Sequence, residues 1–324
     1  MPRVAVILPV FNGERWLATS VSSILLQEDV DFEVVAVNDG STDRSADILD
    51  SYASSRFRVI HNPVNLGLIN SINLALQSTD ADMIARHDQD DVALPGRLKI
   101  QSGALGANRA ASLLGARAYT MTPDGAVSRK PLKYASSDAD IRFRMFFGNP
   151  FLHSSVMFRR DALEEAGGYR MQPWGAFPED YDLWSRMMAV GTALNLTEPL
   201  VVYRQHSRGL SKLKYLEIGR GSREVASRYF LSTVGSSKDL ADFQELYGTL
   251  QRWNVDPIGP RQFARGVGLV RSLSEASQRL SPTQQAVSRG EVARVLLRFG
   301  RAGILAQGGR EPAKKRTVLA DSMD

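Results

Sequence analysis

The 324-residue chain contains no cysteine, which excludes disulfide bridges, thiolate metal sites and a cysteine nucleophile. Long apolar runs are also absent. The longest uncharged and mildly apolar stretch, residues 64–79, is interrupted by Asn65, Asn70 and Asn73, whereas a membrane-spanning helix needs about 20 apolar residues. Residues 1–8 are too short for a signal-peptide core and lack a small-residue cleavage site, so we expect a cytoplasmic protein.

Neither sign of charge dominates the chain, but the two signs are unevenly distributed. The content of 43% hydrophobic and 23% charged residues is that of a globular protein and excludes a disordered chain. Residues 1–206 contain 20 Lys and Arg and 24 Asp and Glu, whereas residues 207–324 contain 20 and 11. An acidic first part and a basic second part predict two regions with different roles, residues 1–210 and 211–324.

The first part alternates the patterns of buried strands and amphipathic helices. Short apolar runs predict strands at residues 4–8, 32–37, 59–60 and 83–85. Apolar residues at helical spacing predict helices at residues 14–27, 46–49 and 69–76. Such alternation is typical of an α/β fold with a mostly parallel central sheet. The first part is therefore predicted to be an α/β domain of the nucleotide-binding type.

After residue 149 the pattern is looser. It predicts strands at residues 155–158 and 200–202 and helices at residues 161–166 and 181–190. From about residue 210 the strand signals fade, and helices are predicted at residues 215–232, 238–253, 261–280 and 284–306. The second part of the chain is thus predicted to be helical.

The strongest signal for chemistry is the segment 87–91, in which Asp88, Asp90 and Asp91 follow the predicted strand 83–85 directly. Ligands of open α/β sheets bind at the carboxyl ends of the strands. Three carboxylates within four positions repel one another, and Mg²⁺ or Mn²⁺, which prefer oxygen ligands, offset that repulsion. The alternative is a solvated acidic turn that caps the following helix.

Two further segments come after predicted strands. In residues 38–43, Asp39 could accept hydrogen bonds from a base or a ribose, and the alternative is an ordinary turn with a helix cap. His206 follows the apolar strand 200–202 and could reach a metal ion or a diphosphate. A lone histidine more often has a structural role, and this alternative stays open.

A third acidic segment opens the helix predicted after Pro178. Glu179 and Asp180 lie in its first turn, where the helix dipole favours carboxylates, so plain helix capping is one explanation. An acid at such a position beside a cleft is also a candidate general base. Trp184, one turn further on, could then form a wall of an acceptor pocket, whereas His153 is expected to be a packing residue.

These segments together resemble the inverting family 2 glycosyltransferases of the GT-A fold. The matching segments are residues 6–12, 37–43, 65–67, 85–91, 179–184 and 203–206. The resemblance extends from residue 3 to about residue 211, nearly two thirds of the chain. It implies a Rossmann-like domain that binds a nucleotide sugar, and the helical, basic residues after it lie outside the match.

The resemblance also implies roles for single residues. Donor-binding positions match Pro9, Phe11, Asn12, Asp39, Asn65, Gly67, Arg86 and Asp88. Among them, Phe11 would lie near the base, and Asp39 would read the edge of uracil or thymine. Asp90 and His206 match contacts to a Mn²⁺ or Mg²⁺ cofactor, and Asp180 matches the general base. Positions near the acceptor or behind the catalytic groups match Glu179, Trp184 and Asp91.

The reaction that the resemblance implies is metal-dependent transfer of one sugar, of the hexosyltransferase type, from a UDP- or dTDP-sugar. The acceptor would be a hydroxyl of a glycan or a lipid-linked glycan, in the assembly of a cell-surface polysaccharide. One carboxylate base opposite the leaving group implies a single displacement with inversion. The metal would stabilise the charge of the leaving diphosphate.

The sequence departs from the family pattern at two places. Asn38 stands where many relatives have an aspartate, so that acid is not essential here or the nucleotide is read differently. The membrane-embedded processive members carry Gln-x-x-Arg-Trp, but here Thr249 precedes Arg252 and Trp253. We therefore expect a non-processive enzyme.

Two other functions were weighed. A sugar nucleotidyltransferase would need a glycine-rich, basic loop after the first strand, but residues 9–15 contain one glycine and an acid. A catalytically inactive module that binds nucleotide sugars is disfavoured by the presence of Asp88, Asp90 and Asp180.

The basic second part suggests a partner of its own. In residues 291–301, Arg294, Arg298 and Arg301 recur between apolar residues, a pattern that fits a helix on an anionic membrane at the inner face of the cell. The alternative is a helical appendage with a solvated basic face. Nucleic acid is not an expected partner, because the basic half lacks interleaved aromatic residues.

Overall fold

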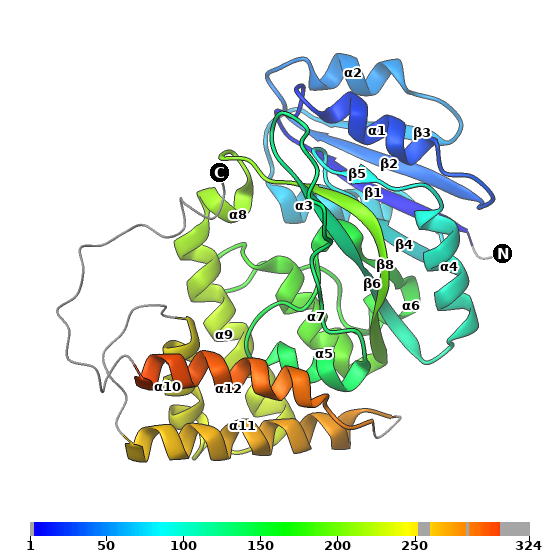
Figure 1. Cartoon of the computed structure of the whole chain (residues 1–324). Coiled ribbons are helices and arrows are strands. Elements are labelled where there is room, and N and C mark those ends of the chain that lie inside the picture. The colour runs from blue at the N-terminus through cyan, green and yellow to red at the C-terminus, as the bar shows by residue number, and fades with distance from the viewer. Residues whose placement is uncertain (1–2, 252–259, 283–284, 305–324) are drawn as a thin grey trace.

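The computed structural model describes residues 3–251, 260–282 and 285–304. Its centre is an eight-stranded sheet with the strand order β3-β2-β1-β4-β7-β6-β8-β5 (Figure 1). The strands are β1 Val4–Val10, β2 Phe32–Asp39, β3 Phe57–Asn62, β4 Met83–Arg86, β5 Val92–Ala93, β6 Ala111–Met121, β7 Met157–Arg159 and β8 Thr192–Arg204. The predicted α/β fold with a mostly parallel sheet is confirmed.

The first four strands of the chain form the parallel half of the sheet. Every residue of β1 and β2 is buried, as expected for strands that are covered on both faces. Alternate residues of β1 point to opposite faces, so Val6 and Leu8 join one core and Ala5 and Ile7 join the other. β1 pairs in parallel with β2 and β4. The carboxyl ends of these three strands therefore meet at one edge of the sheet.

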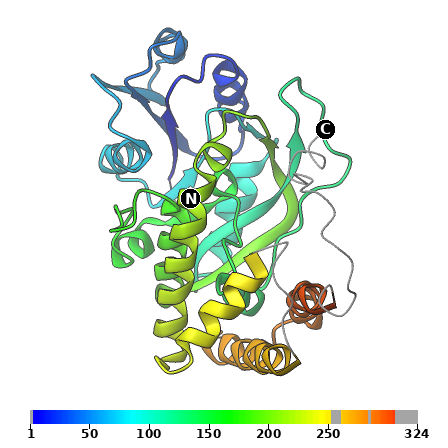
Figure 2. The same cartoon turned by 90° about the vertical axis from the view of Figure 1, so that its left-hand side faces the viewer.

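Helices cover both faces of the sheet (Figures 1 and 2). Up to the end of β8 they are α1 Leu17–Leu25, α2 Ser45–Ser51, α3 Leu68–Gln77, α4 Arg97–Ala107, α5 Asp138–Met145, α6 Arg160–Glu165 and α7 Glu179–Val190. The helices α1, α2 and α4 contribute to the core that contains Val6 and Leu8. The helices α3, α5, α6 and α7 contribute to the core that contains Ala5 and Ile7. Three layers result, with the sheet in the middle.

The strand β6 and the helix α5 are among the elements that were not predicted from the sequence. β6 is rich in small residues, which have low strand propensity, yet Gly115 must be small because a Cβ there would lie 2.7 Å from the Phe151 ring. In α5 the pattern is hidden by charged residues that point inward. Arg142 Nε donates to Asp138 Oδ2 at 2.8 Å, and Arg142 Nη1 donates to the carbonyl of Met188.

The helices after β8 share a core with the first part of the chain. They are α8 Leu210–Leu213, α9 Tyr215–Val234, α10 Leu240–Gln251, α11 Pro260–Leu280 and α12 Arg289–Ile304. The ring of Phe146 lies 4.9 Å from that of Tyr229 and 6.3 Å from that of Phe243, centroid to centroid. The hydrophobic core thus crosses the predicted boundary at residue 210, and the division into regions 1–210 and 211–324 stays a prediction about their roles.

The helix α12 contains the whole basic segment 291–301, for which membrane contact is predicted. Val295 is 1% exposed and belongs to the protein core. Arg294 donates to Glu291, and Arg298 donates to the carbonyl of Leu250. Val292 and Leu296 of α12 pack against the same core, so these described apolar side chains are occupied by contacts within the protein. In the part of the chain that the structure describes, none of the helices is long and apolar enough to span a bilayer. Arg252 and Trp253 lie outside the described residues.

Candidate active site

The loops that follow β1 and β2 are joined by hydrogen bonds at the carboxyl edge of the sheet. Asn12, which has a φ of 50°, accepts the backbone amide of Thr42 at 2.9 Å through its side-chain oxygen. The backbone amide of Asn12 donates to Ser41 Oγ at 3.0 Å, and that of Gly13 donates to Ser45 Oγ at 2.9 Å. These contacts fix the two loops relative to each other.

Asp39 ends β2 and holds the next loop in place. Its Oδ1 accepts the backbone amide of Leu66 and the Asn62 side-chain amide, both at 2.8 Å, and its Oδ2 accepts the amide of Gly67 at 2.9 Å. Asp39 is 3% exposed. Since a carboxylate oxygen has two lone pairs, Oδ2 keeps one for a ligand. The predicted contact to a base edge depends on that lone pair.

The other residues predicted to bind the donor lie around the same edge. Pro9 is buried within β1, where it pairs with Val37 of β2. Gly67 has a φ of 90°, a conformation that favours glycine, and it caps the start of α3. Asn65 precedes it with an exposed side chain. The structure thus brings the predicted donor-binding residues to one rim, and their individual roles stay predictions.

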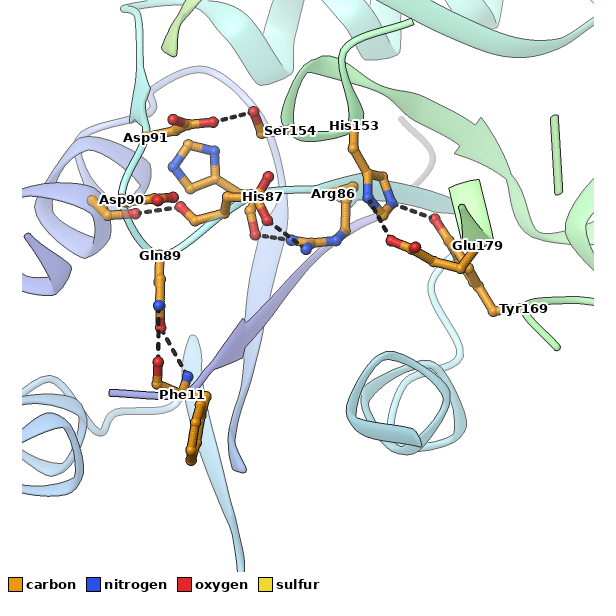
Figure 3. A network of polar contacts seen from close by, with 12 residues as sticks. Phe11, Arg86, His87, Gln89, Asp90, Asp91, His153, Ser154, Tyr169 and Glu179 are labelled. Carbon is orange, nitrogen blue, oxygen red and sulfur yellow. Dashed lines mark hydrogen bonds and ion pairs between the residues drawn. The ribbon is translucent and has the colours of Figure 1, made fainter. Parts of the chain in front are cut away.

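Gln89 joins the acidic loop, residues 87–91, to the loop after β1 (Figure 3). Its Oε1 accepts the backbone amide of Phe11 at 2.8 Å, and its Nε2 donates to the backbone carbonyl of Phe11 at 3.0 Å. A Cβ on Gly13 would lie 2.5 Å from Gln89 Oε1, so the glycine makes room for this amide. The ring of Phe11 is 44% exposed. An exposed aromatic ring is thus held by its backbone next to the acidic loop.

Arg86 places Asp88 at the end of β4. The guanidinium is 1% exposed and donates from Nη2 to Asp88 Oδ1 at 2.6 Å, and from Nη1 to the backbone carbonyl of His87. Ser20 Oγ donates to the backbone carbonyl of Asp88 at 2.9 Å. Burial raises the pKa of Asp88, the charge of Arg86 opposes this, and the charge of Asp90 adds to it. The buried guanidinium of Arg86 therefore orients the carboxylate of Asp88.

A second buried arginine lies behind the loop. Arg97 Nη1 donates to His87 Nδ1 at 2.8 Å, and Arg97 Nη2 donates to the carbonyl of Arg86 at 2.7 Å. Burial lowers the pKa of Arg97 to about 10, so it stays charged at neutral pH. Burial, followed by the charges of Arg97 and Arg86, holds the pKa of His87 well below its usual range. His87 is therefore neutral and accepts at Nδ1.

Asp91 supports the loop from inside. It is fully buried, its Oδ2 accepts the hydroxyl of Ser154, and its Oδ1 accepts the backbone amide of Arg204 at 2.8 Å (Figure 3). Burial raises its pKa well above the usual range, and the charges of Asp90 and Asp88 raise it further. A fully buried Asp91 excludes a simple solvated acidic turn. It ties the loop to the end of β8 and does not face an acceptor.

Asp90 is in contact with His206, and their predicted role as metal ligands stays a prediction. His206 Nε2 lies 2.6 Å from Asp90 Oδ2 although 116 residues separate the two in the chain. The imidazole of His206 packs on the Trp16 ring with centroids 4.4 Å apart. The Arg204 guanidinium lies 5.3 Å from the centroid of the Trp16 ring. Within residues 3–251, 260–282 and 285–304, no three His, Asp or Glu side chains are grouped to hold a metal ion.

Asp180 stands in the first turn of α7. Its Oδ1 accepts the backbone amide of Tyr181 at 2.7 Å, and its Oδ2 accepts the side-chain amide of Asn149 at 2.6 Å. Burial raises the pKa of Asp180 from 3.8 to about 6, the two hydrogen bonds lower it, and the charge of Asp88 raises it. The acidic loop and the start of α7 meet at one short segment, because Ser154 donates to Asp91 and the neighbouring His153 Nδ1 lies 3.5 Å from Glu179 Oε1. A carboxylate with a pKa near neutrality is suited to accept a proton.

Glu179, next to Asp180, belongs to an inner network (Figure 3). Glu179 Oε1 lies 3.5 Å from His153 Nδ1, and His153 Nε2 lies 2.8 Å from the Tyr169 hydroxyl. Burial and the charge of Asp180 raise the pKa of Glu179 well above its usual range. Burial lowers that of His153 well below its usual range. His153 is therefore uncharged, and burial favours the protonated form of Glu179, the residue next to Asp180.

The prediction that Trp184 forms a wall of an acceptor pocket is wrong. Its side chain is fully buried, because α7 turns this position toward the core. The indole packs against Phe151, His153 and Tyr169, at centroid distances of 6.1, 5.9 and 6.3 Å. Trp184 supports the inner network and does not face solvent. The prediction of a packing role for His153 agrees with its contacts.

Three residues of the site were not singled out from the sequence, namely Asn149, Gln89 and Arg97. Asn149 lies in Gly148-Asn149-Pro150, a turn-forming tripeptide outside any helix or strand, where an amide side chain is free to reach a neighbour. Gln89 stands inside the acidic motif, in which the sequence indicates chemistry for the aspartates and not for the glutamine. No local signal marks Arg97, since a helical arginine is expected to be exposed.

The carboxyl edge of this α/β sheet thus carries an acidic loop and a histidine, and a separate carboxylate stands at the start of α7. A model of the family described as glycosyl transferase family 2 matches residues 5–167, half of the chain. The chain belongs to glycosyl transferase family 2. The match covers β1, β2, β4 and the acidic loop, whereas Asp180 and His206 lie beyond it.

Relatives and solved structures agree with this assignment. The family 2 chain is 33% identical over 218 residues to the putative glycosyltransferase EpsE of Bacillus subtilis, which covers 66% of this chain and 77% of EpsE. It is 32% identical to the O-antigen biosynthesis glycosyltransferase WbnJ of Escherichia coli, and the match covers 66% of this chain and 85% of WbnJ. S. aureus TarS 1-349, solved with UDP-GlcNAc, shares the fold with a TM-score of 0.60 at 12% identity, over 94% and 91%. The protein is a glycosyltransferase.

Proposed function

We propose that this glycosyltransferase transfers one sugar from a UDP- or dTDP-sugar to a hydroxyl group, with inversion and with a divalent cation. The observation that carries the proposal is geometric: Asp91 of the acidic loop accepts from Ser154, and Glu179, next to Asp180, lies 3.5 Å from the neighbouring His153. A base for the acceptor and the acidic loop for the donor thus belong to one site. The bound UDP-GlcNAc of TarS supports a nucleotide-sugar donor.

The donor would lie across the rim formed by the loops after β1, β2 and β4. Phe11 offers an exposed ring to a base, and Asp39 offers the remaining lone pair of Oδ2. Asp88, held by Arg86, is positioned for the ribose. The buried charges of Arg86 and Arg97 stabilise a diphosphate and its cation only indirectly, by holding the acidic loop in one conformation.

The residues present fit a cation that is shared between protein and substrate. Asp90 and His206 form an oxygen and nitrogen pair, and His206 Nδ1 is buried with no protein partner. Two protein ligands leave the other positions of Mn²⁺ or Mg²⁺ to phosphate oxygens and water, which is usual for these ions. When bound, the ion would stabilise the negative charge of the leaving diphosphate.

Asp180 would hold the acceptor hydroxyl and accept its proton while the oxygen attacks the anomeric carbon. Asn149 and the amide of Tyr181 fix both carboxylate oxygens, so the base has one orientation. The relative WbnJ, an O-antigen biosynthesis glycosyltransferase, supports an acceptor in polysaccharide assembly, and we propose a glycan or a lipid-linked glycan in the cytoplasm. A single base implies one displacement at each turnover.

The test is a thermal-shift screen of UDP, dTDP, GDP and their sugars with and without Mn²⁺. A ligand at 100 times its Kd stabilises the folded state by about 2.7 kcal/mol, which is easily measured. We expect a Mn²⁺-dependent shift with a uridine or thymidine diphosphate, which Asp90→Ala removes and Asp180→Asn keeps. If Asp180→Asn loses turnover but still binds the nucleotide, this result supports Asp180 as the base. Binding without any turnover would favour an inactive module, and pyrophosphate release from a nucleoside triphosphate would favour a nucleotidyltransferase.

A further inference from the structure

One short segment of the structure concentrates exposed apolar side chains. Among the described residues, fifteen large hydrophobic side chains are exposed, and four of them fall within residues 210–216. They are Leu210 at 45%, Leu213 at 65%, Tyr215 at 59% and Leu216 at 74% exposure. Scattered apolar side chains are normal at a protein surface, but a cluster of this density indicates a contact.

Basic residues alternate with these apolar side chains. Arg208, Lys212, Lys214 and Arg220 lie in residues 208–220, and Glu217 is the only acid there. Lys214 Nζ lies 3.3 Å from Glu217 Oε2, so the acid offsets one lysine. The segment 208–220, which comprises α8 and the first turns of α9, is therefore both apolar and positively charged.

The same segment lies next to the active site. It begins directly after His206, and in both views α8 is at the end of α9 nearest to the N-terminal strands (Figures 1 and 2). A Cβ on Gly175 would lie 2.8 Å from Glu217 Oε1, and a Cβ on Gly221 would lie 2.2 Å from the carbonyl of Phe177. The start of α9 thus contacts the loop that leads to Asp180.

We propose that the segment 208–220 docks the enzyme on an anionic lipid surface. Exposed leucines and a tyrosine enter the interface, while the basic side chains pair with acidic headgroups, as in other interfacial helices. A second copy of this chain is a poorer occupant, because two positively charged segments repel each other. The proposal rests on the proposed function where it concerns the acceptor: a lipid-linked hydroxyl would be presented between His206 and Asp180.

The helix α12 offers a matched comparison. Leu297 is 66% exposed, as Leu213 is, and arginines stand next to it at 294 and 298. Among the α12 residues whose side chains the structure describes, Val295 is buried in the core and Val292 and Leu296 pack against it, so Leu297 is the exposed leucine. If basic charge and one exposed leucine were sufficient, α12 would bind as well as the segment 208–220.

The experiment is co-sedimentation of the full-length protein with vesicles of phosphatidylcholine, with and without phosphatidylglycerol. We expect binding that requires phosphatidylglycerol and weakens at high salt. The double variant Leu213→Ser, Leu216→Ser should bind about tenfold more weakly for each leucine removed. Arg208→Gln with Lys212→Gln should weaken binding about fivefold per charge. Leu297→Ser should bind like the unmodified protein.

Three results would overturn the proposal. They are absence of vesicle binding by the full chain, equal binding by the double leucine variant, and weaker binding by Leu297→Ser alone. Concentration-dependent dimerisation that is lost in the double leucine variant would identify a second copy as the occupant instead. Thermal shifts with UDP and Mn²⁺ on the same variants separate the two proposals, since lipid docking can fail while donor binding persists, and the reverse.

Discussion

Replacement of Asp180 by asparagine should make the protein more stable at neutral pH while it removes the base. Burial raises the pKa of Asp180 from 3.8 to about 6, which means that the folded protein disfavours the charged carboxylate. At about 1.4 kcal/mol per pH unit, this difference corresponds to about 3 kcal/mol of lost stability when the group is ionised. Asparagine carries no charge and keeps a side-chain oxygen for the amide of Tyr181.

The effect of Asp180 ionisation on the free energy of unfolding depends on pH. Below about pH 4 Asp180 is protonated in both the folded and the unfolded state, so the cost is absent, and above about pH 6 it is fully present. Urea unfolding of Asp180→Asn and of the unmodified protein should therefore differ by about 1.5 kcal/mol more at about pH 8 than at about pH 5.

A matched control separates burial from the local hydrogen bond. Asp161 stands in the first turn of α6 and accepts the amide of Ala162 at 2.7 Å, the same contact that Asp180 makes to Tyr181, but its side chain is exposed. Because water solvates this carboxylate, Asp161→Asn should show no comparable change with pH. If the Asp180→Asn difference were constant with pH, burial of the charge would not be the cause, and the argument for an activated base would fail.

Further outcomes follow from other contacts of the site. Asn149→Ala removes a hydrogen bond to the Asp180 carboxylate, so the acid limb of kcat/KM should move up by about one pH unit. His206→Ala should remove the Mn²⁺-dependent part of the thermal shift with UDP and leave the metal-independent part, and an unchanged shift would contradict the metal role. Gly40→Ala should destabilise by about 2 kcal/mol or more, since φ is 68° and the Cβ would lie 2.4 Å from the backbone of Val64. Gly125→Ala, at φ 100° in open space, is the control and should cost about 1 kcal/mol in urea unfolding.

The parallel half of the fold was predictable because its physical cause is local. β1 and β2 are buried on both faces, and such strands appear in the sequence as continuous apolar runs. The acidic loop could be placed for the same reason, since it follows β4 directly. β6 and α5 were not predicted because their residues are selected by contacts with residues distant in the sequence. Examples are the Phe151 ring, which lies next to Gly115, and the carbonyl of Met188, which accepts from Arg142.

The site shows the same limit. Asp180 was recognisable as an acid at the start of a helix, but the amide of Asn149 reaches it from 31 positions away. Trp184 was placed at the surface because α7 was expected to present it one turn after Asp180, yet packing against Phe151 and Tyr169 turns it inward. Side chains that serve a site from the interior leave no local pattern, so only the assembled structure identifies them.

The shared core also limits how this enzyme can be engineered. Phe146 comes from the segment between β6 and β7, whereas its ring neighbours Tyr229 and Phe243 come from α9 and α10. A chain that ends at residue 210 would lack Tyr229 and Phe243, would expose the ring of Phe146 to water, and is expected to aggregate. Exchange of the C-terminal helices with those of a relative, as a route to new acceptors, would succeed only if the contact surface on Phe146 were exchanged with them. The C-terminal helices and the first part of the chain therefore have to be exchanged as one folding unit.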